Sequence, residues 1–244
     1  MKVTTYFSAA EAEQAEMQGC TAVVIDVIRA TSTIVEALAN GARAIYPTVS
    51  TEDAIRLANS LGREDTLLCG ERKGLKVEGF DLGNSPLEYV ADEVGAKRLV
   101  MSTTNGTRAF AAAQGADRVL AASFNNLGAV VRTLRAGNGD VAVICAGKEG
   151  HFALDDALCG GLVVDGLLDG ADPERIFLND ASRAALGLAR QLRPDAELLR
   201  RTAAGAALVE VGLGDDIPVC AEFDRHDLVP EMTDRMIHLP RTHR

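Results

Sequence analysis

Short apolar runs alternate with amphipathic stretches from the first residue to about residue 145. The apolar runs predict strands near residues 2–6, 21–26, 43–48, 66–69, 97–102, 117–122 and 140–145. The stretches between them predict helices near residues 8–18, 31–40, 51–61, 86–94, 105–114 and 125–136. Such alternation requires right-handed crossovers, so the pattern predicts an α/β fold with a largely parallel sheet and helices on both faces.

The pattern changes in the last third of the chain. The apolar run Ala157 to Leu168 predicts one more helix, and residues 180–211 look helical and amphipathic. We expect the five arginines along this second stretch to lie on solvated faces, and the tail from Pro230 to be short, basic and irregular. Because no linker is evident, the chain reads as a single unit over residues 1–244, or as two intimately packed lobes near residues 1–137 and 138–244.

One internal repeat relates two of the predicted strand-helix units. Residues 33–42 and 107–116 are identical at five of ten positions, and in this frame Thr31-Ser32 aligns with Asn105-Gly106. A duplication would place two polar loops at one crevice, because ligands of open α/β sheets bind at the carboxyl ends of strands. A chance match between two alanine-rich helices is the alternative.

The composition limits the classes of function. Hydrophobic residues make up 47% of the chain and aromatic residues 4%, and tryptophan is absent, as in a globular protein with an aliphatic core. The formal net charge of −10 disfavours nucleic acid as a partner, because a phosphate backbone requires a basic face. An anionic substrate must therefore be held by local bases or by a metal.

Location and cysteine usage can be inferred from the same sequence. No apolar run is long enough to span a bilayer, and residues 1–7 read as a first strand rather than a signal peptide. We therefore expect a cytoplasmic protein without a membrane partner. The five cysteines form no Cys-x-x-Cys pair, so a zinc site is not expected, and most of them should be small core residues.

The segment from Cys20 to Thr33 carries the clearest candidate chemistry. A strand ends there in Asp26, and Arg29 and the hydroxyls of Thr31 and Ser32 follow where a helix should begin. An acid at a strand end can hold a divalent metal, and a base beside free helix amides can hold an anion. Alternatively, the segment is only a strand that ends in an acid, followed by a Ser/Thr helix cap.

Residues 69–86 form a second candidate segment. This long glycine-rich connection contains Glu71, Arg72 and Lys73, and its apolar positions indicate that it packs against the fold. It ends in Asn84-Ser85-Pro86, which predicts a helix start with Ser85 as the cap. The alternative is an exposed turn with solvated lysines.

Residues 145–156 form the third candidate loop, with Gly147, Lys148 and Glu149, and then Asp155 and Asp156. Adjacent aspartates on a helix point about 100° apart, so at most one of the two should face a site. The acids and bases of the three segments suit a hard metal and a phosphorylated anion, as in phosphoryl transfer. A histidine-based phosphatase is disfavoured, because only one histidine lies in a candidate loop.

Five ordered motifs carry a resemblance to a known family. They are Val-Ile-Asp-Val-Ile-Arg-Ala-Thr-Ser-Thr at 24–33, Gly-Glu-Arg at 70–72, Gly-Phe-Asp-Leu-Gly-Asn-Ser-Pro at 79–86, Ser-Thr-Thr-Asn-Gly-Thr at 102–107, and Cys-Ala-Gly-Lys-Glu-Gly with Asp-Asp at 145–156. Cys-Ala-Glu-Phe-Asp at 220–224 and Val-Pro at 229–230 extend the likeness over nearly the whole chain. In this order they resemble the motifs of the 2-phosphosulfolactate phosphatase family.

The resemblance implies a family-specific α/β fold and a homodimer. It implies a magnesium-dependent phosphoric monoester hydrolase that cleaves (2R)-O-phospho-3-sulfolactate to (2R)-3-sulfolactate and phosphate, a step of coenzyme M biosynthesis in methanogens. The implied catalytic residues are Asp26, Glu71 and Glu149, and the implied metal ligands are Asp26, Glu71, Glu149 and Asp155. The implied substrate-binding residues are Arg29, Thr31, Ser32, Arg72, Asn84, Ser85, Thr104, Asn105, Gly106, Thr107, Gly147 and Lys148.

Within this set, Asp26 would bind magnesium or attack phosphorus, and Arg29 would hold the phosphate together with amides near residues 105–107. Asp26 could form an aspartyl-phosphate, or a metal-bound water could attack directly. Ile28 occupies the place of the second acid in the Asp-x-Asp pattern of haloacid dehalogenases, which weakens the covalent route. Two other functions stay open: a small-molecule acid phosphatase of different specificity, and a non-catalytic phosphate- or anion-binding protein on the same fold.

Overall fold

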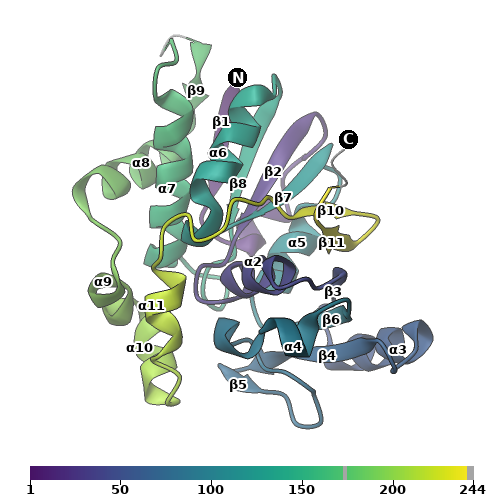
Figure 1. The fold of residues 1–244 in the computed structure, drawn as a ribbon. Coiled ribbons are helices and arrows are strands. Elements are labelled where there is room, and N and C mark those ends of the chain that lie inside the picture. Colours follow the sequence, from purple (N-terminus) through teal and green to yellow (C-terminus); the bar gives the residue numbers. More distant parts are fainter. Residues whose placement is uncertain (173–174, 241–244) are drawn as a thin grey trace.

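The computed structural model describes residues 1–172 and 175–240, which form one large sheet with helices packed around it (Figure 1). The strands are β1 (Lys2–Tyr6), β2 (Cys20–Ile25), β3 (Ala44–Pro47), β4 (Thr66–Arg72), β5 (Leu75–Lys76), β6 (Arg98–Ser102), β7 (Arg118–Ala122), β8 (Asp140–Cys145), β9 (Phe177–Leu178), β10 (Glu231–Thr233) and β11 (Met236–His238). In the described part of the chain they form an eleven-stranded sheet in the order β5-β4-β6-β3-β11-β10-β7-β2-β8-β1-β9.

The helices are α1 (Ala9–Ala12), α2 (Ala30–Ala39), α3 (Thr51–Leu61), α4 (Ala91–Val94), α5 (Gly106–Ala112), α6 (Leu127–Ala136), α7 (Leu154–Leu168), α8 (Asp180–Gln191), α9 (Ala196–Arg201), α10 (Ala203–Glu210) and α11 (Asp216–Cys220). Two 3₁₀ turns, η1 (Pro86–Glu88) and η2 (Phe124–Asn126), precede α4 and α6. Together with the largely parallel strand pairing, this arrangement confirms the predicted α/β fold.

Helices cover both faces of the sheet because side chains along a strand alternate between its faces. In β2, Ala22 and Val24 belong to a buried apolar cluster with residues of α2 and α5. Val23 and Ile25 belong instead to a second cluster with residues of α6 and α7. The strand is therefore apolar on both faces, which explains why it reads as a continuous apolar run rather than an alternating one.

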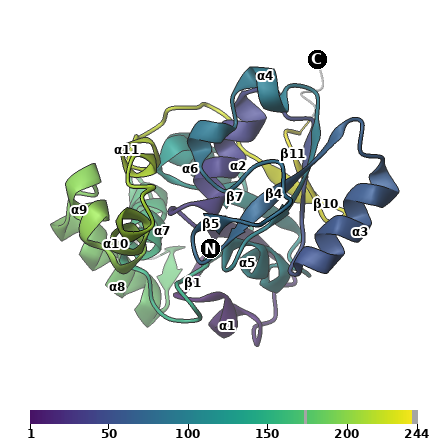
Figure 2. The same ribbon diagram turned by 90° about the horizontal axis from the view of Figure 1, so that it is seen from below.

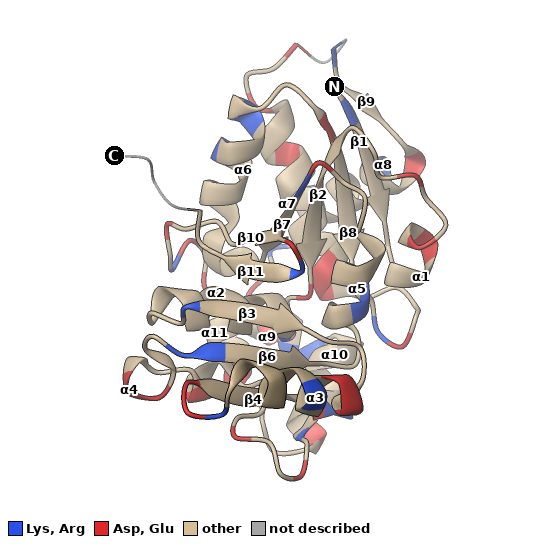
Figure 3. Cartoon of the chain, turned by 90° about the vertical axis from the view of Figure 1, so that its right-hand side faces the viewer, with Lys and Arg blue, Asp and Glu red and all other residues tan. Residues whose placement is uncertain are grey.

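A short antiparallel hairpin, β10–β11, joins two parallel halves of the sheet. On one side β11 pairs with β3, and on the other β10 pairs with β7. Figure 3 shows β3, β4 and β6 running across the direction of β1, β2 and β8. The predicted irregular tail from Pro230 is therefore wrong for the described residues, and residues 241–244 lie outside them. Each hairpin strand has only three residues, too few for an alternating pattern to stand out.

Three predicted helices differ from those observed. The helix expected at 8–18 is limited to α1, which buries only two alanines and so lacks the apolar stripe that stabilises a longer helix. The helix expected at 86–94 is divided into η1 and α4. Residues 180–211 form α8, α9 and α10, because the side chains of Asp195 and Thr202 cap new helices within that stretch.

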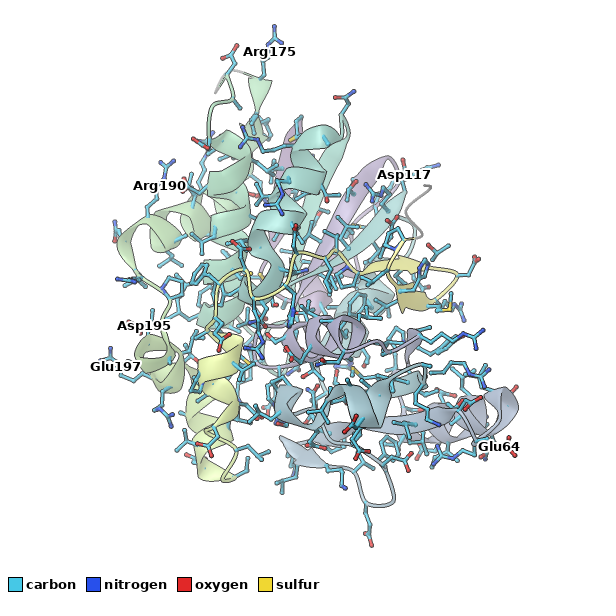
Figure 4. The ribbon with its side chains drawn as sticks, in the orientation of Figure 1. Glu64, Asp117, Arg175, Arg190, Asp195 and Glu197 are labelled. Carbon is cyan, nitrogen blue, oxygen red and sulfur yellow. The ribbon has the colours of Figure 1, made fainter. Side chains whose placement is uncertain are left out.

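Several other expectations are settled by burial. The arginines Arg183, Arg190, Arg193, Arg200 and Arg201 are exposed as predicted, and Figure 4 shows Arg190 pointing away from the sheet. Four of the five cysteines are buried and Cys20 is half-buried, which confirms their assignment to the core. Among the described helices, none combines the length and the apolar composition needed to cross a membrane. The two-lobe division stays a prediction, although β8 lies between β2 and β1 in the shared sheet.

Candidate active site

A cavity of about 310 Å³ lies where the carboxyl ends of strands from both halves of the sheet meet α10. Its walls come from the turn between β2 and α2, the loops after β4, β6 and β8, the first turn of α7, and one side of α10. Figure 2 views the molecule from below, with α10 and β5 on the viewer's side of the sheet. The position agrees with the rule that ligands of α/β sheets bind at strand carboxyl ends.

The loops predicted from the sequence converge on this cavity. Its lining includes Asp26, Arg29, Glu71, Asn84, Thr104, Asn105, Gly147, Lys148, Glu149 and Asp155 from the predicted set. Thr31, Ser32, Arg72, Ser85, Gly106 and Thr107 do not line it. The structure thus places predicted residues from four distant sequence segments together and assigns the remaining ones to supporting contacts.

Two of the supporting side chains stabilise, through hydrogen bonds, the turn that carries Asp26. Thr31 Oγ1 donates to the carbonyl of Asp26 (2.8 Å) and accepts a hydrogen bond from its amide (3.0 Å). Ser32 Oγ donates to the carbonyl of Val27 (2.8 Å). The Ile28–Arg29 peptide bond within this turn is cis. The hydroxyls predicted to bind substrate are therefore already bonded within the turn.

Three other predicted residues shape the segments around the cavity without lining it. Arg72 donates to the carbonyl (3.1 Å) and hydroxyl (2.8 Å) oxygens of Ser102, and so connects β4 with β6 rather than reaching the cavity. Thr107 Oγ1 donates to the carbonyl of Thr103 (2.8 Å). At Gly106 a Cβ atom would lie 2.8 Å from Asp26 Oδ2, so only glycine lets the start of α5 approach Asp26 this closely.

Asp26 is 6% exposed and lines the cavity together with the carboxyl groups of Glu71, Asp155 and Asp156. Its Oδ1 accepts a hydrogen bond from the amide of Ala30 (3.2 Å). The pKa of Asp26 is raised to about 7: burial is the largest cause, the charges of Asp155 and Glu71 add to it, and the amide of Ala30 and the charge of Arg29 oppose it. The environment therefore disfavours the charged form unless a cation compensates it.

Asp155 and Asp156 both line the cavity from the first turn of α7, so the prediction that at most one faces the site is wrong. The reason is that the turn after β2 and the loop after β8 both contact this first turn, which the position along the helix does not predict. Asp156 Oδ1 accepts from the amide of Val27 (2.8 Å) and its Oδ2 from the amide of Gly147 (3.0 Å), which binds two loops together. Asp156 thereby supports the cavity wall, while Asp155 retains an oxygen without a partner.

Burial raises the pKa values of Asp155 and Asp156 as well. It raises the pKa of Asp155 to about 6, against opposing effects from backbone amides and from Lys148. It also raises the pKa of Asp156 well above its usual value, with additional contributions from the charges of Asp155 and Asp26. Three carboxyl groups of one cavity therefore share an environment that penalises negative charge.

Glu71 and Glu149 have different positions. Glu71 is buried, with Oε1 accepting from the amide of Thr104 (2.7 Å) and Oε2 from the amide of Gly74 (2.7 Å). Glu149 is exposed at the tip of a tight turn, and its amide donates to Asn105 Oδ1 (3.1 Å). Glu71 therefore organises the cavity wall, and Glu149 lies at the cavity mouth.

Three buried polar atoms of lining residues have no hydrogen-bond partner in the described structure. They are Asn84 Oδ1, Thr104 Oγ1 and Asp155 Oδ1. Buried polar atoms are almost always hydrogen-bonded, so an unpartnered group is a position where a ligand, ion or water is expected. Their joint occurrence in one cavity favours a polar ligand there.

The cations of the cavity fall into two groups. Arg29 donates to Asp216 Oδ2 (2.7 Å) and to the carbonyl of Gly74 (2.6 Å), so its charge is compensated inside the protein. Lys73 and Lys148 also line the cavity, and neither forms an ion pair with any described residue. The two lysines are therefore the lining cations whose charge no described carboxylate compensates.

Sequence reasoning missed Asp216 and the whole of α10. Ala204, Ala207, Leu208, Glu210 and Val211 of this region form one wall of the cavity. Asp216 was missed because its partner Arg29 lies 187 positions away. The apolar positions of α10 read as an ordinary buried helix face, and no local pattern distinguishes a cavity wall from a core contact.

Comparison with known proteins gives one consistent result. Residues 6–235 match the model of the family described as 2-phosphosulpholactate phosphatase. A protein of Symbiobacterium thermophilum is 41% identical over 226 residues, 92% of this chain and 96% of the relative. One of Clostridium beijerinckii is 37% identical over 237 residues, 97% of this chain and 99% of the relative. Both relatives carry the name "Probable 2-phosphosulfolactate phosphatase".

Proposed function

The chain belongs to the 2-phosphosulfolactate phosphatase family, and from this membership we propose that it hydrolyses (2R)-O-phospho-3-sulfolactate to (2R)-3-sulfolactate and phosphate with the help of magnesium. The family match and the named relatives identify the chain as a phosphatase. The metal and the residue roles are supported by the geometry of the cavity, and this substrate by the name of the family and of the relatives.

The charge balance of the cavity is the main observation in favour of a bound metal ion. Four buried carboxylates, Asp26, Glu71, Asp155 and Asp156, line it, whereas the charge of Arg29 is already compensated by Asp216. Two lysines remain, and an anionic substrate would add further negative charge. A divalent cation would balance this negative charge, which supports a metal ion in the cavity.

The ligand set suits magnesium in particular. Asp26 and Asp155 supply hard oxygens, and Asp155 Oδ1 is buried without a partner. No group of three or more His, Cys, Asp or Glu side chains within the described residues is arranged to hold a metal by itself. Magnesium tolerates this, because it is usually held by one or two carboxylates together with waters and substrate phosphate. When bound, it would neutralise charge on the phosphate oxygens.

The remaining roles follow from position. Lys148 and Lys73 would pair with anionic groups of the substrate, and Arg29 would bind the phosphate through N–H groups that its two internal bonds leave free. Glu71 would hold the loops after β4 and β6 in place. Asp26 would act on phosphorus directly or take a proton from the attacking water, and trapping a phospho-enzyme with labelled substrate separates these routes.

A phosphate-release assay tests the proposal. The purified protein is given 2-phosphosulfolactate, a generic phosphomonoester and phosphoglycolate, each with magnesium and with EDTA. We expect the highest kcat/KM for 2-phosphosulfolactate and loss of activity with EDTA. Preference for another ester would favour an acid phosphatase of different specificity, and no release from any ester would favour an anion-binding protein.

Asp26→Asn should lower kcat by about a hundredfold or more, since a group in direct contact with the reacting atoms contributes on this scale. Asp155→Asn should raise the magnesium concentration required for half-maximal activity. Asp92→Asn, which changes an exposed carboxylate of α4, is the matched control and should leave both quantities unchanged. Near-normal turnover in Asp26→Asn would contradict the role of Asp26.

We also propose that the protein is a cytoplasmic homodimer and that its product is used in coenzyme M biosynthesis. Family membership is the support for these three statements. Sedimentation velocity at micromolar concentration would test the dimer directly.

A further inference from the structure

The most deeply buried ion pair of the described residues lies in the wall of the cavity. Arg29 Nη1 donates to Asp216 Oδ2 at 2.7 Å, and the side chains are 3% and 2% exposed. Arg29 lines the cavity and Asp216 does not, so the carboxylate lies behind the guanidinium as seen from the cavity. A pair in this position can determine how the guanidinium is presented to a ligand.

Asp216 connects segments that are far apart in the sequence. Its second oxygen, Oδ1, accepts a hydrogen bond from Ser85 Oγ (2.5 Å), in the turn that also carries the cavity residue Asn84. Arg29 in turn donates through Nη2 to the carbonyl of Gly74, in the loop after β4 (2.6 Å). Asp216 thus joins the turn after β2 to the turn that carries Asn84, and Arg29 joins the turn after β2 to the loop after β4.

The two internal bonds leave part of the guanidinium free. An arginine side chain has five N–H donors in a rigid planar fork, which suits two oxygens of a phosphate or carboxylate. The bonds to Asp216 and Gly74 come from Nη1 and Nη2. Without Asp216, a buried arginine would lack its counter-charge and would turn toward another acceptor, of which the cavity offers several carboxylates.

We propose that Asp216 is a positioning residue: it holds Arg29 in the orientation in which its free N–H groups contact an anionic oxygen of the substrate. The inference rests on the proposed phosphatase function of the cavity. Asp216 itself does not touch the substrate. Its effect is expressed in substrate affinity, because the orientation of Arg29 matters as soon as the anion binds.

A double-mutant cycle tests the proposal. Asp216→Ala, Arg29→Ala and the double variant are compared with the unchanged protein for kcat and KM on 2-phosphosulfolactate. Each single substitution should raise KM about tenfold or more, and the double variant should be no worse than Arg29→Ala alone, since both remove the same interaction. A purely structural role of Asp216 would reduce the folded fraction, and thus apparent kcat, with KM unchanged.

Asp216→Asn keeps the test informative if Asp216→Ala folds poorly. An asparagine can accept from Arg29 through its oxygen and donate to Ser85 through its amide, so it should restore most of the KM lost in Asp216→Ala. Asp65→Ala is the matched control: it breaks the Lys97–Asp65 pair just before β6 and β4, which does not line the cavity, and should leave KM unchanged.

The same four proteins are also compared for their affinity for inorganic phosphate, measured by calorimetry. This second comparison separates the positioning role of Asp216 from the proposed phosphatase function. If no ester is hydrolysed, the proposed function fails, and coupling between positions 29 and 216 in phosphate binding still decides the inference. Additive effects on KM and on phosphate binding would overturn the positioning role. So would an Asp216→Asn variant that folds but loses as much affinity as Asp216→Ala.

Discussion

At the residue scale, Glu36 shows how a side chain away from the cavity supports it. Its Oε2 accepts hydrogen bonds from His226 Nε2 (2.7 Å) and Arg225 Nε (3.1 Å), which fastens the segment after α11 to α2. Burial alone would raise the pKa of Glu36, but the hydrogen bonds from His226 and Arg225 outweigh it, and the pKa is lowered. Because α2 begins at the turn that carries Arg29, this contact stabilises the helix on which the site depends.

Glu36→Gln should lower the free energy of unfolding by about 1–3 kcal/mol near neutral pH, because hydrogen bonds to a charged group are weakened. Since the pKa of Glu36 is lower in the folded than in the unfolded state, its contribution is complete above the unfolded value and is lost as the pH falls through the folded value. Urea unfolding of Glu36→Gln and of the unchanged protein should therefore show a difference in the free energy of unfolding that shrinks below a pH of about 4.5.

The matched control is Glu64→Gln, which changes an exposed glutamate at the end of the molecule that carries α3 (Figure 4). It should leave the free energy of unfolding unchanged across the same pH range. A difference between Glu36→Gln and the unchanged protein that persists undiminished at low pH would contradict the assigned contribution.

At the scale of elements, α7 is held between the sheet and α8 by small residues. Near the sheet, a Cβ atom at Gly160 would lie 3.1 Å from a methyl carbon of Val143 in β8. On the other side, a Cβ atom at Gly161 would lie 2.1 Å from the carbonyl oxygen of Ala185 in α8. Since Asp155 and Asp156 occupy the first turn of α7, the close packing of this helix also places two carboxylates of the cavity.

Two separate substitutions of a helical glycine by alanine should therefore have opposite effects on the stability of the protein. Gly161→Ala should destabilise the protein by about 1–3 kcal/mol, because the backbone of α8 must move away. Gly187→Ala, at a position of α8 where no atom lies within 4 Å of the added Cβ, should stabilise it by about 0.5–1 kcal/mol through helix propensity. Thermal unfolding of both variants gives the sign of each change in stability. Changes of the same sign would contradict the packing argument.

At the scale of the whole molecule, the β10–β11 hairpin holds the two halves of the sheet together. Ile237 of β11 is fully buried, and Arg118 of β7 forms two hydrogen bonds with the carboxylate of Glu231 in β10. The cavity needs both halves, because Asp26 follows β2 in one and Glu71 lies in β4 of the other. The hairpin is therefore part of what brings the two groups of loops together.

A chain that ends at Val229 should lose both its cooperative unfolding transition and its activity. Without the hairpin, β3 and β7 would expose unpaired edges, and such edges promote aggregation. A chain that ends at Pro240 keeps every described strand and is the matched control. Size-exclusion chromatography and thermal unfolding compare the two, and a monodisperse, cooperatively folded chain ending at Val229 would overturn this role of the hairpin.

The sequence alone determined the α/β class, the seven longer strands, and the loops that carry Asp26, Glu71, Lys148 and Asp155. These follow from local patterns, because strand periodicity and polar residues at strand ends are encoded within about ten neighbouring residues. Only the tertiary structure decided which side chains face the cavity. Thr31 and Arg72 turn out to be bonded elsewhere, and Asp216 and α10 enter the site through contacts across nearly two hundred positions. Side-chain direction and distant pairing depend on packing, which local periodicity does not encode.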